Sequence, residues 1–297
     1  MSTIEAAEAL GDVRAVELSA GTVEVHDTGG ESPVVVLIGG LAIGPSLWRG
    51  VVDDLRADHR CIVPNLPWGA HRIPMRPGAD LTLRGHARLV AGLLEALDLR
   101  DVVLVENDTG MAQLVAADHA ARLAGLVLTS CEAFDNYPPG LAGKAVGLIG
   151  RLPGGLYLAM QQLRLRPLRR SPLTYGWMSR RPIPDAELDA WLHPLQTDRA
   201  IRRDVEAYVR HLDRRVLLEA ADRLRGFDRP ALVAWAADDK LMPVEHGRRL
   251  AALLPQGRFV LVPDSRTLIP LDQPRALAGL VRELVREAQA RSSRPTP

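Results

Sequence analysis

Cysteine and aromatic residues are scarce in this sequence, and long apolar runs are missing. The 297 residues include two cysteines, and aromatic residues make up 4% of the chain. Cys61 and Cys131 are too few for a disulfide framework, which favours a reducing, cytoplasmic compartment. No apolar run approaches the roughly 18 residues that a membrane span requires, and the N-terminal residues 1–13 lack the pattern of a secretory signal. We therefore expect no membrane partner.

Net charge is also nearly absent. The 37 basic and 36 acidic side chains leave a formal charge of +1, which argues against a general nucleic-acid binder. Hydrophobic residues at 47% and charged residues at 25% are typical of a globular protein with a sizeable core. We expect a small-molecule substrate, no metal and no cofactor. Nothing in the sequence indicates an oligomeric state.

Short β-rich runs alternate with amphipathic helical patterns along most of the chain. Hydrophobic periodicity predicts strands over 22–26, 34–38, 61–63, 102–105, 126–128, 231–235 and 259–262. It predicts helices over 83–97, 110–121, 245–254 and 274–288. Strands that alternate with helices indicate an α/β fold with a mostly parallel sheet covered on both faces.

Residues 132–225 interrupt this alternation with many prolines and little strand signal. We interpret them as a helical cap inserted after the sixth strand, between core segments 14–131 and 226–289, and we expect a disordered tail over 290–297. The cap is rich in arginine. Solvated helix faces are the favoured explanation, and an electropositive lid that attracts an anionic or polyphenolic substrate is the alternative.

The segment from Val102 to Gly110 is a buried strand that leads through a tight turn into a helix. This is the layout of a nucleophile elbow, in which the reactive side chain, here Asp108, projects above the sheet. A small residue is needed where the strand and helix backbones approach each other, and Gly110 fits. Glu106 occupies a position where glycine is usual. The alternative role for Asp108 is to cap the following helix.

Three further segments extend this pattern in the order of a known family. Gly39-Gly40-Leu41 matches an oxyanion loop, residues 235–243 match the segment that places the triad acid at Asp239, and residues 263–274 match the histidine segment. From 23 to 285 the chain resembles an α/β-hydrolase. The aspartate at the elbow resembles the haloalkane dehalogenase and epoxide hydrolase branch, in which a carboxylate attacks carbon and a histidine then activates water.

The histidine of that branch is absent, because the matching position is Thr267. Threonine is no base near neutral pH, so an ester formed on Asp108 would be long-lived. The residue after the elbow is Thr109, where dehalogenases have tryptophan. The resemblance implies an oxyanion hole formed by the backbone N–H groups of Leu41 and Thr109, next to Gly40.

Other residues are candidates for the missing roles. His71 follows a strand and is the best substitute base, donor or substrate clamp, although a solvated loop histidine is an equally good interpretation. Glu106 is expected to pair with an arginine or a backbone group; alternatively it shares a proton with Asp108. The candidate substrate-binding residues are Trp48, Trp68, Arg72, Tyr137, Trp177 and Thr267.

Three functions are compatible with these residues. The favoured one is non-hydrolytic acid–base chemistry (addition, cyclisation or C–C bond formation) on a bulky aromatic molecule, because proton transfer needs only one positioned carboxylate. The arginine- and alanine-rich composition suggests a natural-product pathway by association. The alternatives are an epoxide, haloalkane or ester hydrolase with a relocated histidine, and a non-catalytic ligand-binding protein.

Overall fold

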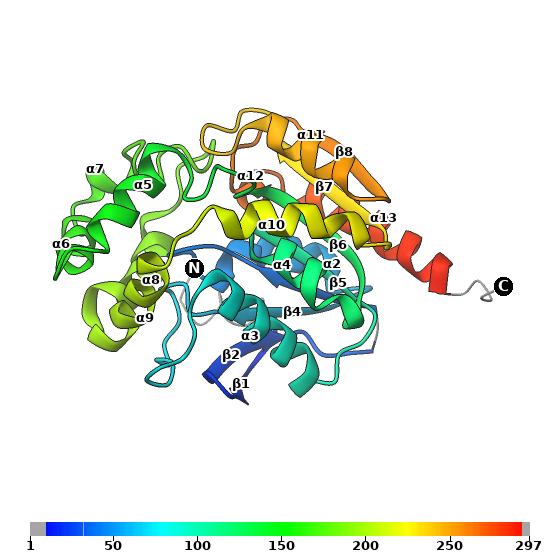
Figure 1. Cartoon of the computed structure of the whole chain (residues 1–297), viewed down its shortest axis with the longest axis horizontal. Coiled ribbons are helices and arrows are strands. Elements are labelled where there is room, and N and C mark those ends of the chain that lie inside the picture. The colour runs from blue at the N-terminus through cyan, green and yellow to red at the C-terminus, as the bar shows by residue number, and fades with distance from the viewer. Residues whose placement is uncertain (1–9, 32, 293–297) are drawn as a thin grey trace.

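Eight strands form one sheet across the core of the protein (Figure 1). The computed structural model describes residues 10–31 and 33–292. The strands are β1 (Asp12–Leu18), β2 (Gly21–Asp27), β3 (Val34–Ile38), β4 (Arg60–Asn65), β5 (Val102–Asp108), β6 (Leu123–Cys131), β7 (Ala231–Ala236) and β8 (Gly257–Val262). Their order in the sheet is β1-β2-β4-β3-β5-β6-β7-β8.

The six strands from β4 to β8 in this order are parallel, and β1 and β2 extend the sheet as antiparallel strands. β3 and β5 lie in the middle and every one of their residues is buried. Continuous Val, Leu and Ile in β3 suit a strand with both faces covered. The predicted α/β fold with a mostly parallel sheet is confirmed.

Helices flank the sheet and build the cap. They are α2 (Arg49–Leu55), α3 (Leu83–Ala96), α4 (Met111–Asp118), α5 (Gly140–Ile149), α6 (Gly155–Gln162), α7 (Arg166–Arg169), α8 (Asp185–Thr197), α9 (Arg199–Arg210), α10 (Arg215–Arg223), α11 (Val244–Leu253), α12 (Ile269–Asp272) and α13 (Pro274–Ser292). Short 3-10 turns lie at Pro45–Trp48, Ala120–Arg122 and Leu224–Gly226. No helix in the described ranges is long and apolar enough to cross a membrane.

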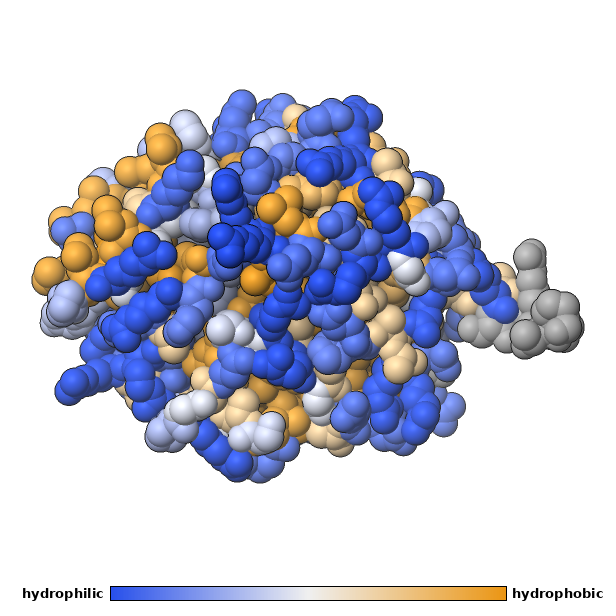
Figure 2. Space-filling model, viewed as in Figure 1, coloured by the Kyte–Doolittle hydropathy of each residue, from blue (hydrophilic) through white to orange (hydrophobic). Residues whose placement is uncertain are grey.

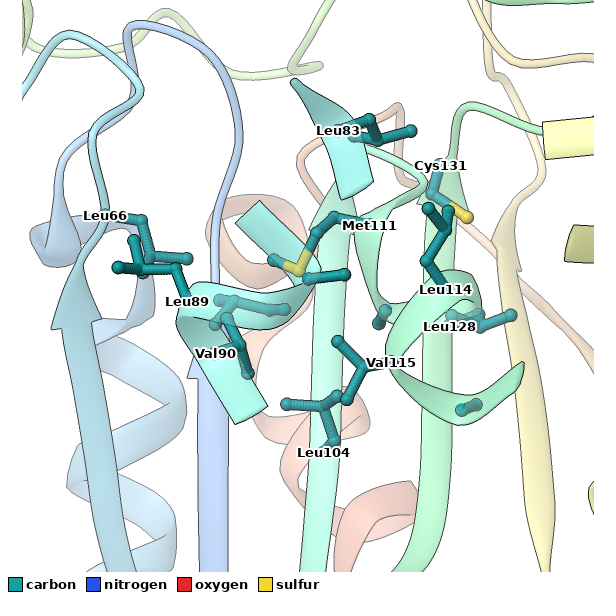
Figure 3. Close-up of a cluster of buried hydrophobic side chains, with 14 of the residues drawn as sticks. Leu66, Leu83, Leu89, Val90, Leu104, Met111, Leu114, Val115, Leu128 and Cys131 are labelled. Carbon is teal, nitrogen blue, oxygen red and sulfur yellow. The ribbon is translucent and has the colours of Figure 1, made fainter. Parts of the chain in front are cut away.

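Two hydrophobic clusters cover the two faces of the sheet. One joins the sheet to α3, α4, α10 and α11, and the other joins it to α2 and α13. Figure 3 shows the first cluster where Leu89 and Val90 of α3 and Leu114 and Val115 of α4 meet Leu104 of β5. This packing fixes α4 behind the end of β5, where Asp108 lies.

The helices α5 to α9 follow β6 and lie together at one end of the molecule (Figure 1). Two hydrogen bonds tie this cap to the loop after β3: the Tyr175 hydroxyl donates to the Ala42 carbonyl at 2.7 Å, and Trp191 Nε1 donates to Ser46 Oγ at 2.8 Å. α10 then returns to the core, where Leu217 joins the cluster with α4.

The predicted elements are present with different ends. The helix expected over 110–121 stops at Asp118, because His119 at φ −137° leaves the helical conformation and a 3-10 turn follows. The tail expected to be disordered over 290–297 begins as helix, since α13 continues to Ser292; residues 293–297 lie outside the described residues. β1 and α2 are elements that the sequence patterns did not predict.

Candidate active site

Polar side chains gather where the parallel strands end. Asp108 ends β5, Glu132 follows β6, Asp239 follows β7, and Thr267 follows β8. The loop with Gly40 follows β3 in the middle of the sheet. The carboxyl ends of parallel strands form one edge, which is where open α/β sheets place their ligands. The predicted elbow, acid and threonine positions therefore converge on the same edge.

Asp108 has the backbone conformation of an elbow. Its φ of 81° is in the left-handed region, which is uncommon for any residue other than glycine. A side chain at Gly40 would place its Cβ 1.9 Å from Asp108 Oδ2, and one at Gly110 would place it 2.7 Å from the Glu132 carbonyl oxygen. The two glycines let neighbouring backbone approach Asp108 closely. The N-cap of α4 is Gly110, without a side-chain cap, so Asp108 does not serve as that cap.

The Asp108 carboxyl is buried, at 9% exposure, and its proton affinity is altered. Burial is the main cause that raises the pKa of Asp108 to about 7. The Leu41 backbone N–H donates to the carboxylate and lowers this pKa, whereas the charge of Asp239 raises it further. A carboxyl with this pKa is present in both protonation states near neutral pH.

Asp239 is held by several donors. Its Oδ1 accepts from the N–H groups of Leu241 and Met242 at 2.9 and 2.8 Å and from the Thr267 hydroxyl at 2.9 Å. The Ser130 hydroxyl also bonds to this carboxyl, while burial raises its pKa. Thr267 is fully buried. The Thr267 hydroxyl therefore lies beside Asp239 and donates to that acid.

Glu106 caps the helix behind the elbow. Its Oε1 accepts from the Ala112 N–H at 3.0 Å and from Thr109 Oγ1 at 2.8 Å, at the start of α4. A carboxyl at this end of a helix satisfies free N–H groups and opposes the helix dipole. Burial raises the pKa of Glu106 to about 8, with a contribution from Asp108. The expected pairing of Glu106 with a backbone group is confirmed.

Glu132 belongs to the site and the sequence patterns did not single it out. It is buried, its Oε2 has no hydrogen-bond partner, and its N–H donates to the Asp108 carbonyl at 2.9 Å. Burial raises its pKa well above the usual value, and the charges of Asp108 and Glu106 raise it further. The sequence feature that could have identified Glu132 is its position directly after β6, the strand beside β5, at the same edge of the sheet as Asp108.

The two expected oxyanion donors both have partners within the protein. The Leu41 N–H donates to the Asp108 carboxylate, and the Thr109 N–H donates to the Asn107 carbonyl at 3.2 Å. The Leu41 donor therefore stabilises the anionic form of Asp108 itself.

The sequence matches the family model of the alpha/beta hydrolase fold over residues 33–274, most of the chain. The chain belongs to the α/β-hydrolase fold family.

Its relatives in this family are enzymes with several activities. It is 31% identical over 107 residues to a haloalkane dehalogenase from Mesorhizobium japonicum, a match that spans 35% of this chain and 34% of the relative's length. It is 26% identical to a 2-hydroxy-6-oxononadienedioate/2-hydroxy-6-oxononatrienedioate hydrolase from Cupriavidus pinatubonensis, over 87% of this chain and 90% of that protein.

Solved structures support the same fold. A haloalkane dehalogenase loop variant from Bradyrhizobium elkanii superimposes with a TM-score of 0.76 at 18% identity, covering 95% of this chain and 99% of that structure. An esterase from Thermogutta terrifontis superimposes with a TM-score of 0.71 at 23% identity, covering 94% and 99%. These identities establish a shared fold and leave the reaction open.

His71 does not contact Asp108 in this α/β-hydrolase. Its Nδ1 accepts from the Gly69 N–H at 3.2 Å, so Nε2 has the proton and donates to Asp204 Oδ2 at 3.3 Å. The Nδ1 bond thus holds the ring within the loop after β4, and the Nε2 bond joins that loop to α9 of the cap. Across residues 10–31 and 33–292, no hydrogen bond links a histidine to Asp108. His71 therefore links the loop after β4 to the cap, and these contacts do not support the interpretation of His71 as the base that replaces the missing histidine.

Several residues expected to bind substrate serve as packing or lie on the surface of this hydrolase fold. Trp68 is buried and stacks on His86 with ring centroids 3.8 Å apart. Trp48 is fully buried among the residues of α2 and α13. Trp177, at 43% exposure, and Arg72 are exposed. The structure places Trp48 and Trp68 in the core packing and Trp177 on the surface, and their expected contact with a substrate stays a prediction.

Tyr137 remains next to the buried carboxyls. Its hydroxyl donates to the Tyr208 hydroxyl at 3.1 Å, and Tyr208 packs edge-on against Trp68. Burial raises the pKa of Tyr208 well above the usual value, and the charges of Glu132 and Asp108 contribute. The described residues contain no group of His, Cys, Asp and Glu side chains that could hold a metal ion.

Proposed function

We propose that this α/β-hydrolase-fold protein catalyses proton transfer on a small molecule, with the Asp108 carboxyl as general acid and base. The observation that supports this most is the Asp108 side chain: an elbow presents it, burial raises its pKa to about 7, and no histidine bonds to it. A general acid–base group works best when its pKa lies near the pH at which it operates.

The same residues disfavour hydrolysis through a covalent ester. That route needs a base to deprotonate water after the carboxylate has attacked carbon. Thr267 stands beside Asp239 and donates its hydroxyl to that acid. A hydroxyl with an ordinary pKa cannot take the proton from water near pH 7. An ester on Asp108 would accumulate instead of turning over.

In the proposed reaction, the Asp108 carboxylate takes a proton from the substrate and later returns it. Before the reaction, the Leu41 N–H donates to the Asp108 anion. Once Asp108 is protonated, the negative charge lies on the substrate, and the Leu41 N–H is a preorganised donor for it. Asp239 opposes a second negative charge at the site, so it favours the protonated form of Asp108.

A second candidate is hydrolysis of a halide, epoxide or ester. The names of the relatives favour it, since they include a haloalkane dehalogenase and a dienedioate hydrolase. The idea of a natural-product or C–C bond-forming reaction has no support from these relatives. The buried packing of Trp48 and Trp68 also removes the argument for a large, flat aromatic substrate.

Hydrogen–deuterium exchange of a C–H acid tests the proposal without knowledge of the natural substrate. Acetylacetone and cyclohexanone in D2O are followed by proton NMR with the wild-type protein, Asp108→Asn and the control Asp101→Asn. Asp101 also has a left-handed backbone, at φ 51°, and is exposed. We expect exchange above the buffer rate that rises through an apparent pKa near 7 and is lost only in Asp108→Asn.

The same preparations are incubated with 1-bromohexane, styrene oxide and 4-nitrophenyl acetate. Intact-protein mass spectrometry then reports any adduct on Asp108, and labelled water reports hydrolysis. Turnover with a covalent intermediate on Asp108 and no C–H exchange would establish the hydrolase alternative and refute proton-transfer catalysis. The intermediate would be an alkyl ester from 1-bromohexane or styrene oxide, with release of bromide or opening of the epoxide, and a mixed anhydride from 4-nitrophenyl acetate, with release of 4-nitrophenolate.

A further inference from the structure

The outer end of the cap exposes an unusual amount of apolar surface. Twelve large hydrophobic side chains of the described residues are exposed, and nine of them lie between residues 141 and 177. They are Leu141, Leu148, Leu152, Tyr157, Leu158, Leu165, Leu168, Leu173 and Trp177. Figure 2 shows apolar side chains gathered at the end of the molecule formed by α5, α6 and α7. We call this surface, residues 141–177, the cap face. Contiguous exposed apolar surface of this kind marks an interaction site.

The cap face is also positively charged throughout. Residues 136–184 contain no aspartate or glutamate, although the chain has 36 acidic residues, and they contain eight basic ones: Lys144, Arg151, Arg164, Arg166, Arg169, Arg170, Arg180 and Arg181. The acids that pair with the arginines here come from elsewhere in the chain: Asp185 pairs with Arg166 and Arg170. Among the described residues, Lys144, Arg151 and Arg164 form no ion pair with an acid.

A basic groove of about 530 Å³ opens beside α6 and α7. Arg164, Arg166 and Arg169 line it together with Asp189 and His193 of α8. Arg169 is buried and pairs with Asp189 at 2.7 Å, so the cationic character that faces solvent comes from the exposed Arg164 and Arg166. Arginine forks of this kind suit phosphate oxygens.

We propose that the cap face docks on an anionic lipid bilayer, with its leucines inserted among the acyl chains and its basic side chains at the phosphate headgroups. Exposed leucine and tryptophan interleaved with arginine in the sequence provide the two forces that hold a peripheral protein on such a membrane. The long arginine side chains can reach headgroups while leucines penetrate deeper.

A protein partner fits this surface less well. The exposed leucines lie on α5, α6, α7 and the turns next to them, whereas a partner helix binds in an apolar groove. The groove here is lined by arginines and other polar side chains. A symmetric dimer through the cap face would bring the same patch of each copy together. The six basic residues that residues 141–177 contain, with no acid among them, would then repel those of the other copy.

Vesicle co-sedimentation of the full chain tests the docking. The vesicles consist of phosphatidylcholine alone or of equal parts phosphatidylcholine and phosphatidylglycerol. We expect binding to the mixed vesicles, little to the neutral ones, and release at about 1 M salt, where the screening length falls to about 3 Å. Each of Arg151→Gln and Arg164→Gln should weaken binding about fivefold. Each of Leu158→Ser and Leu165→Ser should weaken it about tenfold.

Matched controls use exposed residues outside the cap face. Leu261→Ser on β8 and Arg286→Gln on α13 should leave vesicle binding unchanged, and all variants alter exposed side chains, so their thermal unfolding should match the wild type. Equal binding to neutral and anionic vesicles, or none to either, would overturn the proposal. A dimer in sedimentation velocity that Leu158→Ser dissociates, without vesicle binding, would assign the cap face to a second copy of this chain instead.

Discussion

Asp108→Asn should make the protein more stable at neutral and alkaline pH. The substitution keeps the shape of the side chain, and asparagine tolerates the left-handed backbone that Asp108 adopts at φ 81°. It removes a group whose ionised form is disfavoured by burial and by the charge of Asp239. The difference in unfolding free energy between the variant and the wild type therefore measures the stability that the protein loses by holding an ionisable carboxyl at this buried position.

The size and pH range of the effect follow from the pKa. The pKa of Asp108 rises from 3.8 in the unfolded chain to about 7 in the folded protein. Because the folded state binds the proton more tightly, the wild type loses stability as the pH rises from about 4 to about 7, and the loss is complete above that. A shift of roughly three units corresponds to at most about 4 kcal/mol. The asparagine variant lacks this loss.

Urea unfolding at intervals between pH 5 and pH 9 measures the difference. The unfolding free energy of Asp108→Asn minus that of the wild type should rise by about 2–4 kcal/mol across this range. The exposed control Asp101→Asn should show a difference that is constant with pH. A constant difference for Asp108→Asn as well, or one that falls with pH, would refute a raised pKa at the elbow and with it the acid–base role.

Two further substitutions probe the neighbours of Asp108 and Asp239. Gly40→Ala would place its Cβ 1.9 Å from Asp108 Oδ2, so the Asp108 carboxyl must move. The rate of C–H exchange measured by NMR should therefore fall at least tenfold. The control Gly92→Ala has open space around its Cβ and should leave the exchange rate unchanged. Thr267→Val removes the hydroxyl that donates to the buried Asp239, raises the pKa of that acid and should cost about 1–3 kcal/mol in urea unfolding. An equal loss in Thr197→Val, whose hydroxyl bonds a helix carbonyl at an exposed position, would contradict this explanation.

The sequence predicted the buried parts of the fold well because their signals are local. The run 34–38 coincides with β3, since a central parallel strand is apolar on both faces. The same rule fails at the edge of the sheet: β1 exposes most of its seven residues and pairs only with β2, so its sequence shows neither continuous nor alternating apolar residues. α2 was missed because seven residues are too few to establish a helical period.

The candidate site divides in the same way. Asp108, Asp239 and Thr267 were located because each follows a buried strand at a recognisable motif. The environment of His71 depends on Asp204, which is 133 residues away in the chain, and no local pattern reveals that pairing. Glu132 was overlooked for a related reason, because its importance comes from the strand beside it in the sheet. The burial of Trp48 and Trp68 could not be predicted either, because scarcity in the composition says nothing about which neighbours bury a side chain.

The side chain that bonds to Asp239 from the loop after β8 is the neutral hydroxyl of Thr267. Asp108, Glu106 and Glu132 are buried and Asp239 is partly buried, and burial raises the pKa of all four carboxyls. A histidine opposite Asp239 would provide a cation that keeps carboxylates ionised, and Thr267 provides only a hydroxyl. Burial therefore favours the protonated forms of these carboxyls, and a pKa of about 7 lets Asp108 change its charge near neutral pH. A scaffold that holds one mobile proton among buried acids is suited to proton transfer, and it is poorly suited to activating water.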